Sequence, residues 1–364
     1  MRLADLIADH HDYVYSGLLD SGQFTAFQSV KRCRTVESGG ALYSCGECQT
    51  KRFVYHSCGN RFCPGCQNHR NSQWLYRQNQ KLLPCEYFMI TFTVPAQLRA
   101  IPRNRLKDFY KAFFDCASAA IKELCSSRLK GECGMIGVLH SHSRQLAFHP
   151  HIHFIVPAIV LKREQQSIVR LTKEFFLSGH ALAELFRGKF LAELKALKID
   201  FPRFLYGKKW NADCKPKGRG KEVFQYLARY LMRGVVSEKA LKRHAGKVEL
   251  SYRDSNDGSV KKVTFDEVAF LKRLAWHVLP KGFRRVRSYG FLAPAGKKML
   301  QRLQLLLHAD LPDEELPPTP VVKCPCCDAA MVLIVHYLNK EQVQKEQRSN
   351  PMIRSPPITS KLRQ

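Results

Sequence analysis

Two histidines set two residues apart in an apolar segment constrain the fold of this chain more than any other feature. They are His151 and His153, within the segment Phe148 to Val160. Alternate residues of a β-strand point to the same face, so the two imidazoles would project side by side. The preceding apolar segment, Met135 to His142, predicts the other arm of an antiparallel hairpin and carries His140. We therefore expect an antiparallel sheet with three histidines gathered on one face.

This histidine group is a candidate site for a divalent metal. His140 is the expected third ligand beside His151 and His153, His142 has the same parity and is the reserve, and His149 stands at the start of the strand. The alternative is a set of structural histidines, but a His-hydrophobic-His pair facing another His across a hairpin favours metal. Three imidazoles suit Zn²⁺ or Mn²⁺ better than Mg²⁺. Positions left open beyond three protein ligands would let the ion polarise a phosphate oxygen.

The cysteines predict a second kind of metal site. Two knuckles, Cys45-x2-Cys48 and Cys63-x2-Cys66, offer four thiolates to one tetrahedral Zn²⁺, which would make that zinc structural. Cys33 and Cys58 lie close by and are either further ligands or spare. A third knuckle, Cys324-Pro325-Cys326-Cys327, is either the remnant of a ribbon or part of a site completed elsewhere. The first twenty residues do not read as a signal peptide, so we expect a reducing compartment, where clustered cysteines bind metal.

The charge of the chain indicates a polyanionic partner. Lys and Arg number 59 against 31 Asp and Glu, a formal net charge of +28. Such an excess is typical of nucleic-acid binding. There is no uninterrupted apolar run of about 18 residues, so we expect no membrane span and a place in the cytoplasm.

A pair of tyrosines follows a basic loop. Tyr226 and Tyr230 are four residues apart in a predicted helix, 222–232, and so share one helix face. Such a pair is usually core packing, but here cationic residues surround it. A tyrosine hydroxyl near a metal-held phosphate would be a candidate nucleophile. The cations that we expect to contact DNA, each of which could instead be a solvated surface charge, are Lys217, Arg219, Lys221, Arg229, Arg284, Arg285 and Arg287.

The remaining pattern predicts an α+β protein. We expect strands at 87–94, 135–142, 149–161, 204–210, 247–253 and 260–265, helices at 105–129, 171–199, 222–232 and 265–277, and a basic loop at 215–221. The predicted domains are a helical lead with a zinc-binding domain at 1–80, a catalytic domain at 85–308, and a Pro-rich linker, partial knuckle and disordered tail at 309–364.

Several motifs together resemble one known family. They are Cys33-Arg34-Thr35, the segment Ser57 to Cys66, the histidine-rich segment His149 to His153, Tyr226-Leu227-Ala228-Arg229-Tyr230, and the segment His277 to Phe291. In this order they resemble the two-tyrosine HUH transposases of rolling-circle insertion sequences, the insertion-sequence ninety-one group, over nearly the whole chain. The resemblance implies a zinc-ribbon-like N-terminal domain and an HUH endonuclease domain, an antiparallel sheet packed with helices. It also implies that His151 and His153 bind Mg²⁺ or Mn²⁺ and that Tyr226 and Tyr230 are the nucleophiles.

The implied activity is nicking and strand transfer of single-stranded DNA through a 5′-phosphotyrosine. The expected partners are the single-stranded ends of the element and target DNA. Because the chain has no Walker A motif, we expect a helicase and replication proteins to come from the host. The resemblance also implies a bacterial protein that lies near the nucleoid. One alternative is a plasmid relaxase or replication initiator with the same chemistry. Another is a non-enzymatic zinc-finger DNA-binding protein, and a hydrolytic zinc enzyme is disfavoured because no HExxH motif is present.

Overall fold

A computed structural model describes residues 1–66, 68–162, 167–171, 176–220, 222–225, 235–254, 257–311 and 315–349. The chain forms two compact units. Unit 1 comprises Met1–Arg70, Gly234–Val278 and Glu315–Gln364, and unit 2 comprises Asn71–Arg233 and Leu279–Glu314. These units differ from the three contiguous ranges expected from the sequence. Residues 234–278 group with the N-terminal segment, which they contact through the ion pairs His10–Glu267 and Asp9–Arg243. The C-terminal segment joins the same unit because residues 331–337 pair as a strand with residues 40–45. The predicted disorder from Asn350 lies outside the described residues.

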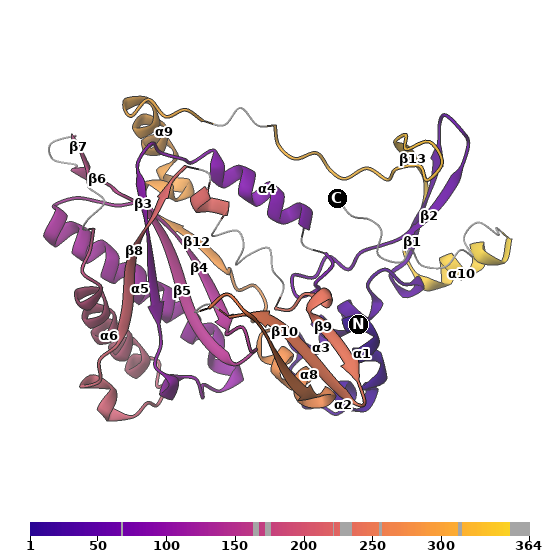
Figure 1. Ribbon diagram of the computed structural model, residues 1–364, viewed down its shortest axis with the longest axis horizontal. Coiled ribbons are helices and arrows are strands. Elements are labelled where there is room, and N and C mark those ends of the chain that lie inside the picture. Colours follow the sequence, from indigo (N-terminus) through magenta and orange to yellow (C-terminus); the bar gives the residue numbers. More distant parts are fainter. Residues whose placement is uncertain are drawn as a thin grey trace. The chain divides into compact units, whose positions relative to one another are not determined.

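Unit 2 is built on a five-stranded sheet in the order β12-β4-β5-β3-β8, with every pair antiparallel (Figure 1). The two central strands of the predicted hairpin form as expected, and the α+β class is confirmed. The strands are β3 (Glu86–Thr93), β4 (Met135–His142), β5 (Phe148–Pro157), β8 (Asn211–Arg219) and β12 (Val286–Tyr289). A separate two-stranded sheet joins β6 (Ile159–Lys162) to β7 (Ser167–Arg170).

One face of the five-stranded sheet carries the larger core. Helices α5 (Leu106–Leu129) and α6 (Gly179–Ala196) pack on it through aromatic side chains, including Phe113 and Phe186, whose rings stack 5.3 Å apart. The sheet contributes the side chains of Phe88, Ile90, Phe92, Ile152 and Phe154. Alternation along β3 and β5 sends every second residue to this layer, which is why the odd-numbered histidines of β5 face the other way.

The opposite face of the five-stranded sheet carries a second hydrophobic core. The histidines lie on this same face, toward one end of the strands. Tyr87, Met89 and Ile155 lie on this face and pack with α4 (Asn68–Asn79) and α9 (Lys297–Leu306). Residues 222–225 form helical structure, and Val223 and Phe224 belong to the same core. The rings of Tyr87 and Phe224 lie 5.8 Å apart. The segment that leads to Tyr226 therefore begins on the histidine-bearing face of the sheet.

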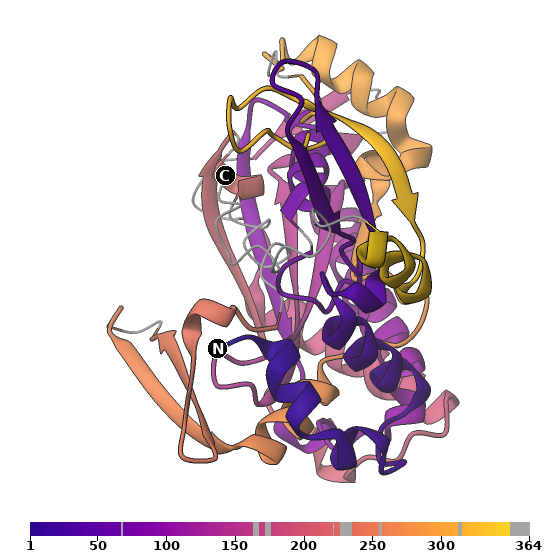
Figure 2. The same ribbon diagram turned by 90° about the vertical axis from the view of Figure 1, so that its right-hand side faces the viewer.

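Unit 1 contains two small sheets. Strands β9 (Leu241–His244), β10 (Lys247–Arg253) and β11 (Val260–Asp266) form one, in the order β11-β10-β9. The other is ordered β13-β1-β2, and Figure 2 shows the yellow β13 beside the dark hairpin. Its strands are β1 (Gly40–Cys45), β2 (Lys51–Tyr55) and β13 (Met331–Tyr337). The helices of unit 1 are α1 (Leu3–Asp9), α2 (His11–Tyr15), α3 (Ser21–Arg32), α8 (Glu267–Trp276) and α10 (Lys340–Ser349).

Three local predictions from the sequence are wrong. Residues 204–210 do not form a strand, since Arg203–Tyr206 is a 3₁₀ helix. The expected basic loop at 215–221 is largely the end of β8, an edge strand in which the missing N–H of Pro216 is tolerated. Helix α6 spans Gly179–Ala196, so it begins later than the helix expected at 171–199. Among the described residues, no helix is long and apolar enough to cross a membrane.

Candidate functional site

The three predicted histidine ligands meet on one face of the unit 2 sheet. His140 on β4 pairs directly with His151 on β5, and His153 follows two residues along the same strand. The ligand atoms of the three rings lie within 4.8 Å of one another. The reserve residue, His142, lies beside His140 with ring centroids 4.3 Å apart and the rings tilted by 54°, but it is not part of this group. Strand pairing therefore produces the cluster that the hairpin pattern predicts.

Hydrogen bonds fix which nitrogens can bind a metal. His151 Nδ1 lies 2.7 Å from the carbonyl oxygen of His149, which only accepts, so Nδ1 carries the proton and Nε2 offers a lone pair. That Nε2 lies 3.1 Å from Nδ1 of His140. Two nitrogens bound at about 2.0–2.1 Å to one ion would be separated by about 3.0–3.4 Å. The His140–His151 pair thus has the spacing of two ligands sharing one ion.

The third ring is held by a side chain. Thr91 on β3 pairs directly with His153, and its Oγ1 lies 2.9 Å from His153 Nδ1. If Nδ1–H donates to this hydroxyl, Nε2 of His153 is the ligand atom. Orientation of a ligating imidazole through its second nitrogen is typical of metal sites in proteins.

The protein environment keeps these imidazoles neutral. Burial, followed by the neighbouring histidines, lowers the pKa of His140 well below its usual value. Burial also lowers the pKa of His151 to about 4 and that of His153 to about 3. A metal ligand must be the deprotonated imidazole, so the cluster is in the binding-competent form at neutral pH.

Three cationic side chains surround the histidines. Arg285 donates from Nε to the carbonyl oxygen of Leu139 at 3.0 Å, and its charge lowers the pKa of His140 and His151. The charge of Lys217 acts on His153, and that of Arg99 acts on His151. Arg99 was not predicted from the sequence. The one sequence feature that could have indicated it is its position shortly after the strand that carries Thr91. The three cations create a positive potential where an anionic phosphate would approach.

Two residues predicted to contact DNA form ion pairs within the protein. Arg287 Nη1 lies 3.0 Å from Asp115 Oδ1, and its guanidinium is 4.6 Å from the ring centroid of Phe114, on the α5 side of the sheet. Arg219 Nε lies 3.3 Å from the buried carboxylate of Glu86. Arg284 is exposed. Tyr226, Tyr230, Lys221 and Arg229 lie outside the described residues.

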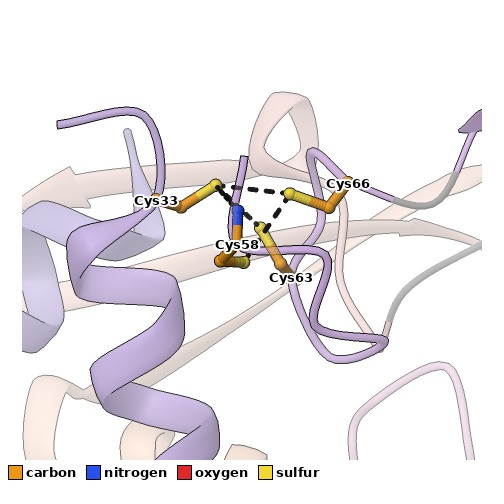
Figure 3. Close-up of side chains that lie close together, drawn as sticks. All are labelled: Cys33, Cys58, Cys63 and Cys66. Carbon is orange, nitrogen blue, oxygen red and sulfur yellow. Dashed lines mark hydrogen bonds between the residues drawn. The ribbon is translucent and has the colours of Figure 1, made fainter. Parts of the chain in front are cut away.

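The first cysteine cluster lies in unit 1 and consists of Cys33, Cys58, Cys63 and Cys66 (Figure 3). The Sγ atom of Cys33 lies 3.3 Å from that of Cys66 and 3.7 Å from that of Cys63, and Cys58 and Cys66 are 3.6 Å apart. Four sulfurs at about 2.3 Å from a tetrahedral zinc would be separated by about 3.8 Å. Contacts with Cys58 and then Cys63 lower the pKa of Cys33 to about 7, which favours the thiolate.

The predicted grouping of Cys45 and Cys48 with Cys63 and Cys66 is wrong. Cys33 and Cys58 complete the first cluster, while Cys45 and Cys48 join Cys324 and Cys327 in a second one. The β1–β2 hairpin is the reason, because Cys45 ends β1 at the turn whereas Tyr55 pairs with Gly40 at the open end. Five residues of strand span about 17 Å, too far for one ion to join both knuckles.

Comparisons with known proteins match both the cysteine-bearing and the histidine-bearing parts of the chain to transposase families. Residues 6–94 match the family described as "Transposase zinc-binding domain", and residues 134–299 match the family described as "Putative transposase". The "Putative transposase y4qJ" of Sinorhizobium fredii (strain NBRC 101917 / NGR234) is 29% identical over 361 residues, covering 88% of this chain and 91% of that protein. The "Transposase for insertion sequence element IS801" of Pseudomonas savastanoi pv. phaseolicola is 27% identical over 286 residues, covering 72% of this chain and 68% of that protein.

No solved structure matches this chain. The first cysteine cluster falls entirely within the zinc-binding match, and all three clustered histidines fall within the transposase match. Together the two matches span well over half of the chain. The chain therefore belongs to the insertion-sequence transposases of the ninety-one type, which combine a zinc-binding domain with a transposase domain.

Proposed function

We propose that this transposase nicks and transfers single-stranded DNA by way of a covalent tyrosine intermediate. The observation that carries the proposal is the group of three neutral histidines on one face of the sheet. Helical residues Val223 and Phe224, which immediately precede the tyrosine segment, pack on that same face. A divalent cation held by His140, His151 and His153 would polarise the scissile phosphate and stabilise the charge that develops on it.

The three imidazoles favour Mn²⁺ over Mg²⁺ as the ion, since Mg²⁺ prefers oxygen ligands. His151 and His153 are oriented through their second nitrogens by the His149 carbonyl and the Thr91 hydroxyl. Arg99, Arg285 and Lys217 would hold the non-bridging oxygens of the DNA backbone near the cluster. These contacts are independent of base sequence, so they position the strand rather than select it.

The cleavage step assigned to the tyrosines conserves the energy of the DNA backbone. The phenolic oxygen of Tyr226 or Tyr230 attacks the phosphorus, and its proton leaves to solvent. The bond from phosphorus to the 3′ oxygen breaks, which gives a 5′-phosphotyrosine and a free 3′-OH. The second tyrosine cleaves the target strand in the same way. Attack by the new 3′-OH on the phosphotyrosine then joins the strands and regenerates the tyrosine, so no ATP is consumed.

The zinc-binding domain would serve DNA recognition. Cys33, Cys58, Cys63 and Cys66 have the donor set and spacing of a closed structural zinc site, with no coordination position left for a substrate. We propose that this site holds the loop that contacts the ends of the element, and that a host helicase supplies the single strand.

The test is a covalent-adduct assay with oligonucleotides from the element ends and Mn²⁺ or Mg²⁺. Wild-type protein should give an adduct that survives a denaturing gel. The variant carrying both Tyr226→Phe and Tyr230→Phe should give none, and His151→Ala should lose at least about a hundredfold in rate. Full adduct from the double tyrosine variant would show that the nucleophile lies elsewhere.

Two matched controls separate chemistry from folding. His180 is exposed on α6 and contacts Glu184, so His180→Ala should retain wild-type activity. Tyr252 lies on β10 in unit 1, and Tyr252→Phe should likewise retain activity. Equal losses in control and test variants would contradict the assignment.

A further inference from the structure

We infer that Cys45, Cys48, Cys324 and Cys327 bind a second structural zinc ion, which fastens the C-terminal segment of the chain to the N-terminal β1–β2 hairpin. Two of these residues lie beyond the range that matches the zinc-binding family, residues 6–94. The inference concerns the architecture of unit 1 and does not depend on the proposed nicking chemistry.

The sulfur positions fit a tetrahedral metal. Cys45 Sγ lies 3.5 Å from Cys327 Sγ, Cys48 Sγ lies 3.5 Å from Cys324 Sγ, and Cys48 and Cys327 are 3.7 Å apart. All four ligand atoms are within 4.8 Å of one another. The edge of a zinc–thiolate tetrahedron is about 3.8 Å, whereas a disulfide bond is about 2.05 Å. The four sulfurs therefore surround a common centre rather than forming two disulfides.

The two knuckles have the same backbone hydrogen bonds and the same φ angles at equivalent positions. This similarity is an observation independent of the sulfur distances. Gln49 N–H donates to Cys45 O at 3.1 Å, and Asp328 N–H donates to Cys324 O at 3.0 Å. Both residues after the second cysteine are left-handed, with φ of 58° at Gln49 and 57° at Asp328. Two equivalent turns that present paired thiolates toward each other are what a closed four-cysteine zinc site requires.

The continuation of each knuckle matches as well. Cys45 N–H donates to Thr50 O, and Cys324 N–H donates to Ala329 O, both at 2.9 Å. In each case the chain turns back on itself directly after the second thiolate. The first knuckle thereby closes the β1–β2 hairpin, and the second closes a small hairpin whose ends meet at the bridge between Lys323 and Ala330.

The surrounding sheet holds the second knuckle against the first. Strand β13 pairs antiparallel with β1 from Gly40–Tyr337 to Cys45–Met331, so the register leads straight to the cysteines. Arg52 Nη1 donates to the carbonyl oxygen of Lys323 at 2.7 Å. Cys45 and Cys324 are buried at 0% and 3% exposure and pack with Met331. Zinc would therefore join two ends of the chain separated by about 275 residues, and residues 321–349 would be an integral part of the zinc-binding unit.

Cobalt substitution of the full-length protein tests the inference. Co²⁺ bound by four thiolates gives thiolate-to-cobalt charge-transfer absorption that a histidine site lacks, with an intensity that scales with the number of thiolates. We expect two equivalents of this species per wild-type chain and one per chain in the Cys324→Ser, Cys327→Ser double variant. Cys326 lies in the same knuckle but outside the cluster, so Cys326→Ser is the matched control and should retain two. One equivalent in wild type, or two in the double variant, would overturn the inference.

An alkylation experiment on zinc-loaded wild-type protein needs no variant and so holds even if the double variant fails to fold. Cys48, Cys326 and Cys327 are all exposed, so burial does not distinguish them. We expect N-ethylmaleimide to modify Cys326 rapidly, and Cys48 and Cys327 only after zinc is removed by a chelator. Equal rates at the three thiols before chelation would refute a metal at this site.

Discussion

Thr91→Val should weaken metal binding at the histidine cluster without disturbing the sheet. The hydroxyl of Thr91 lies 2.9 Å from Nδ1 of His153, and Thr91 pairs with His153 across β3 and β5. Valine keeps the β-branched shape that suits a strand and removes only the hydroxyl. The substitution therefore isolates the hydrogen bond that orients one ligand ring.

The expected magnitude follows from how the three rings are held. Loss of a hydrogen-bond partner behind a metal ligand typically costs 10- to 100-fold in metal affinity, about 1.4–2.8 kcal/mol. The ring of His151 is oriented by a backbone carbonyl, which the substitution leaves in place. Only one of three ligands loses its support, so we expect the lower end of the range, about tenfold weaker Mn²⁺ binding.

Isothermal titration of Mn²⁺ into the zinc-loaded protein measures the effect directly, and the adduct rate against Mn²⁺ concentration measures it through function. At saturating Mn²⁺ the rate should return close to that of wild type, because the nucleophile is untouched. Thr93→Val is the matched control on the same strand face, since no hydrogen bond joins Thr93 to a histidine within the described part of the chain. Unchanged affinity in Thr91→Val, or an equal loss in Thr93→Val, would refute the orientation of His153 by Thr91.

Three further predictions concern stability and DNA affinity. The hydrogen bond from Arg243 lowers the pKa of Glu267 from 4.5 to about 2. The stability that this carboxylate contributes is therefore present above about pH 4.5 and is lost as the pH falls toward 2. The difference in denaturation midpoint between wild type and Glu267→Gln should shrink on acidification, and a constant difference would contradict this. Arg287→Ala should destabilise the protein by about 1–2 kcal/mol in urea unfolding and leave DNA affinity unchanged, because the Arg287 guanidinium contacts Asp115 and Phe114. Arg284→Ala should instead weaken DNA binding and reduce the salt dependence of that binding. The reverse pattern in the two variants would be contrary evidence. Gly290 has φ of +59° and an added Cβ would lie 2.0 Å from the carbonyl oxygen of Cys133, so Gly290→Ala should cost at least about 1 kcal/mol, and a wild-type melting temperature would count against the packing described there.

The sequence was most informative where one local pattern had one structural solution. Alternation around His151 and the apolar arm that carries His140 predict a hairpin, and the three histidines meet because cross-strand neighbours in such a hairpin are close in space. The long amphipathic helix α5 was predicted within one residue at its start, because its apolar spacing is regular over the whole length.

The pairing of the cysteine knuckles could not be predicted because it depends on contacts distant in sequence. Each CxxC turn offers two ligands, and any two turns can combine. Only the pairing of β13 with β1 brings Cys324 to Cys45. Strand β12 was missed for a different reason, since Arg287 makes its short sequence read as a basic surface although that side chain packs over Phe114.

The central claim is that a histidine-bound metal activates DNA for attack by a tyrosine of the segment after Phe224. The most direct measurement is mass spectrometry of the peptide that carries DNA after reaction with a single-stranded element end. The account predicts that the 5′ phosphate is attached to Tyr226 or Tyr230, and only when Mn²⁺ or Mg²⁺ is present. Attachment to any other residue, or the same yield in excess chelator, would contradict it.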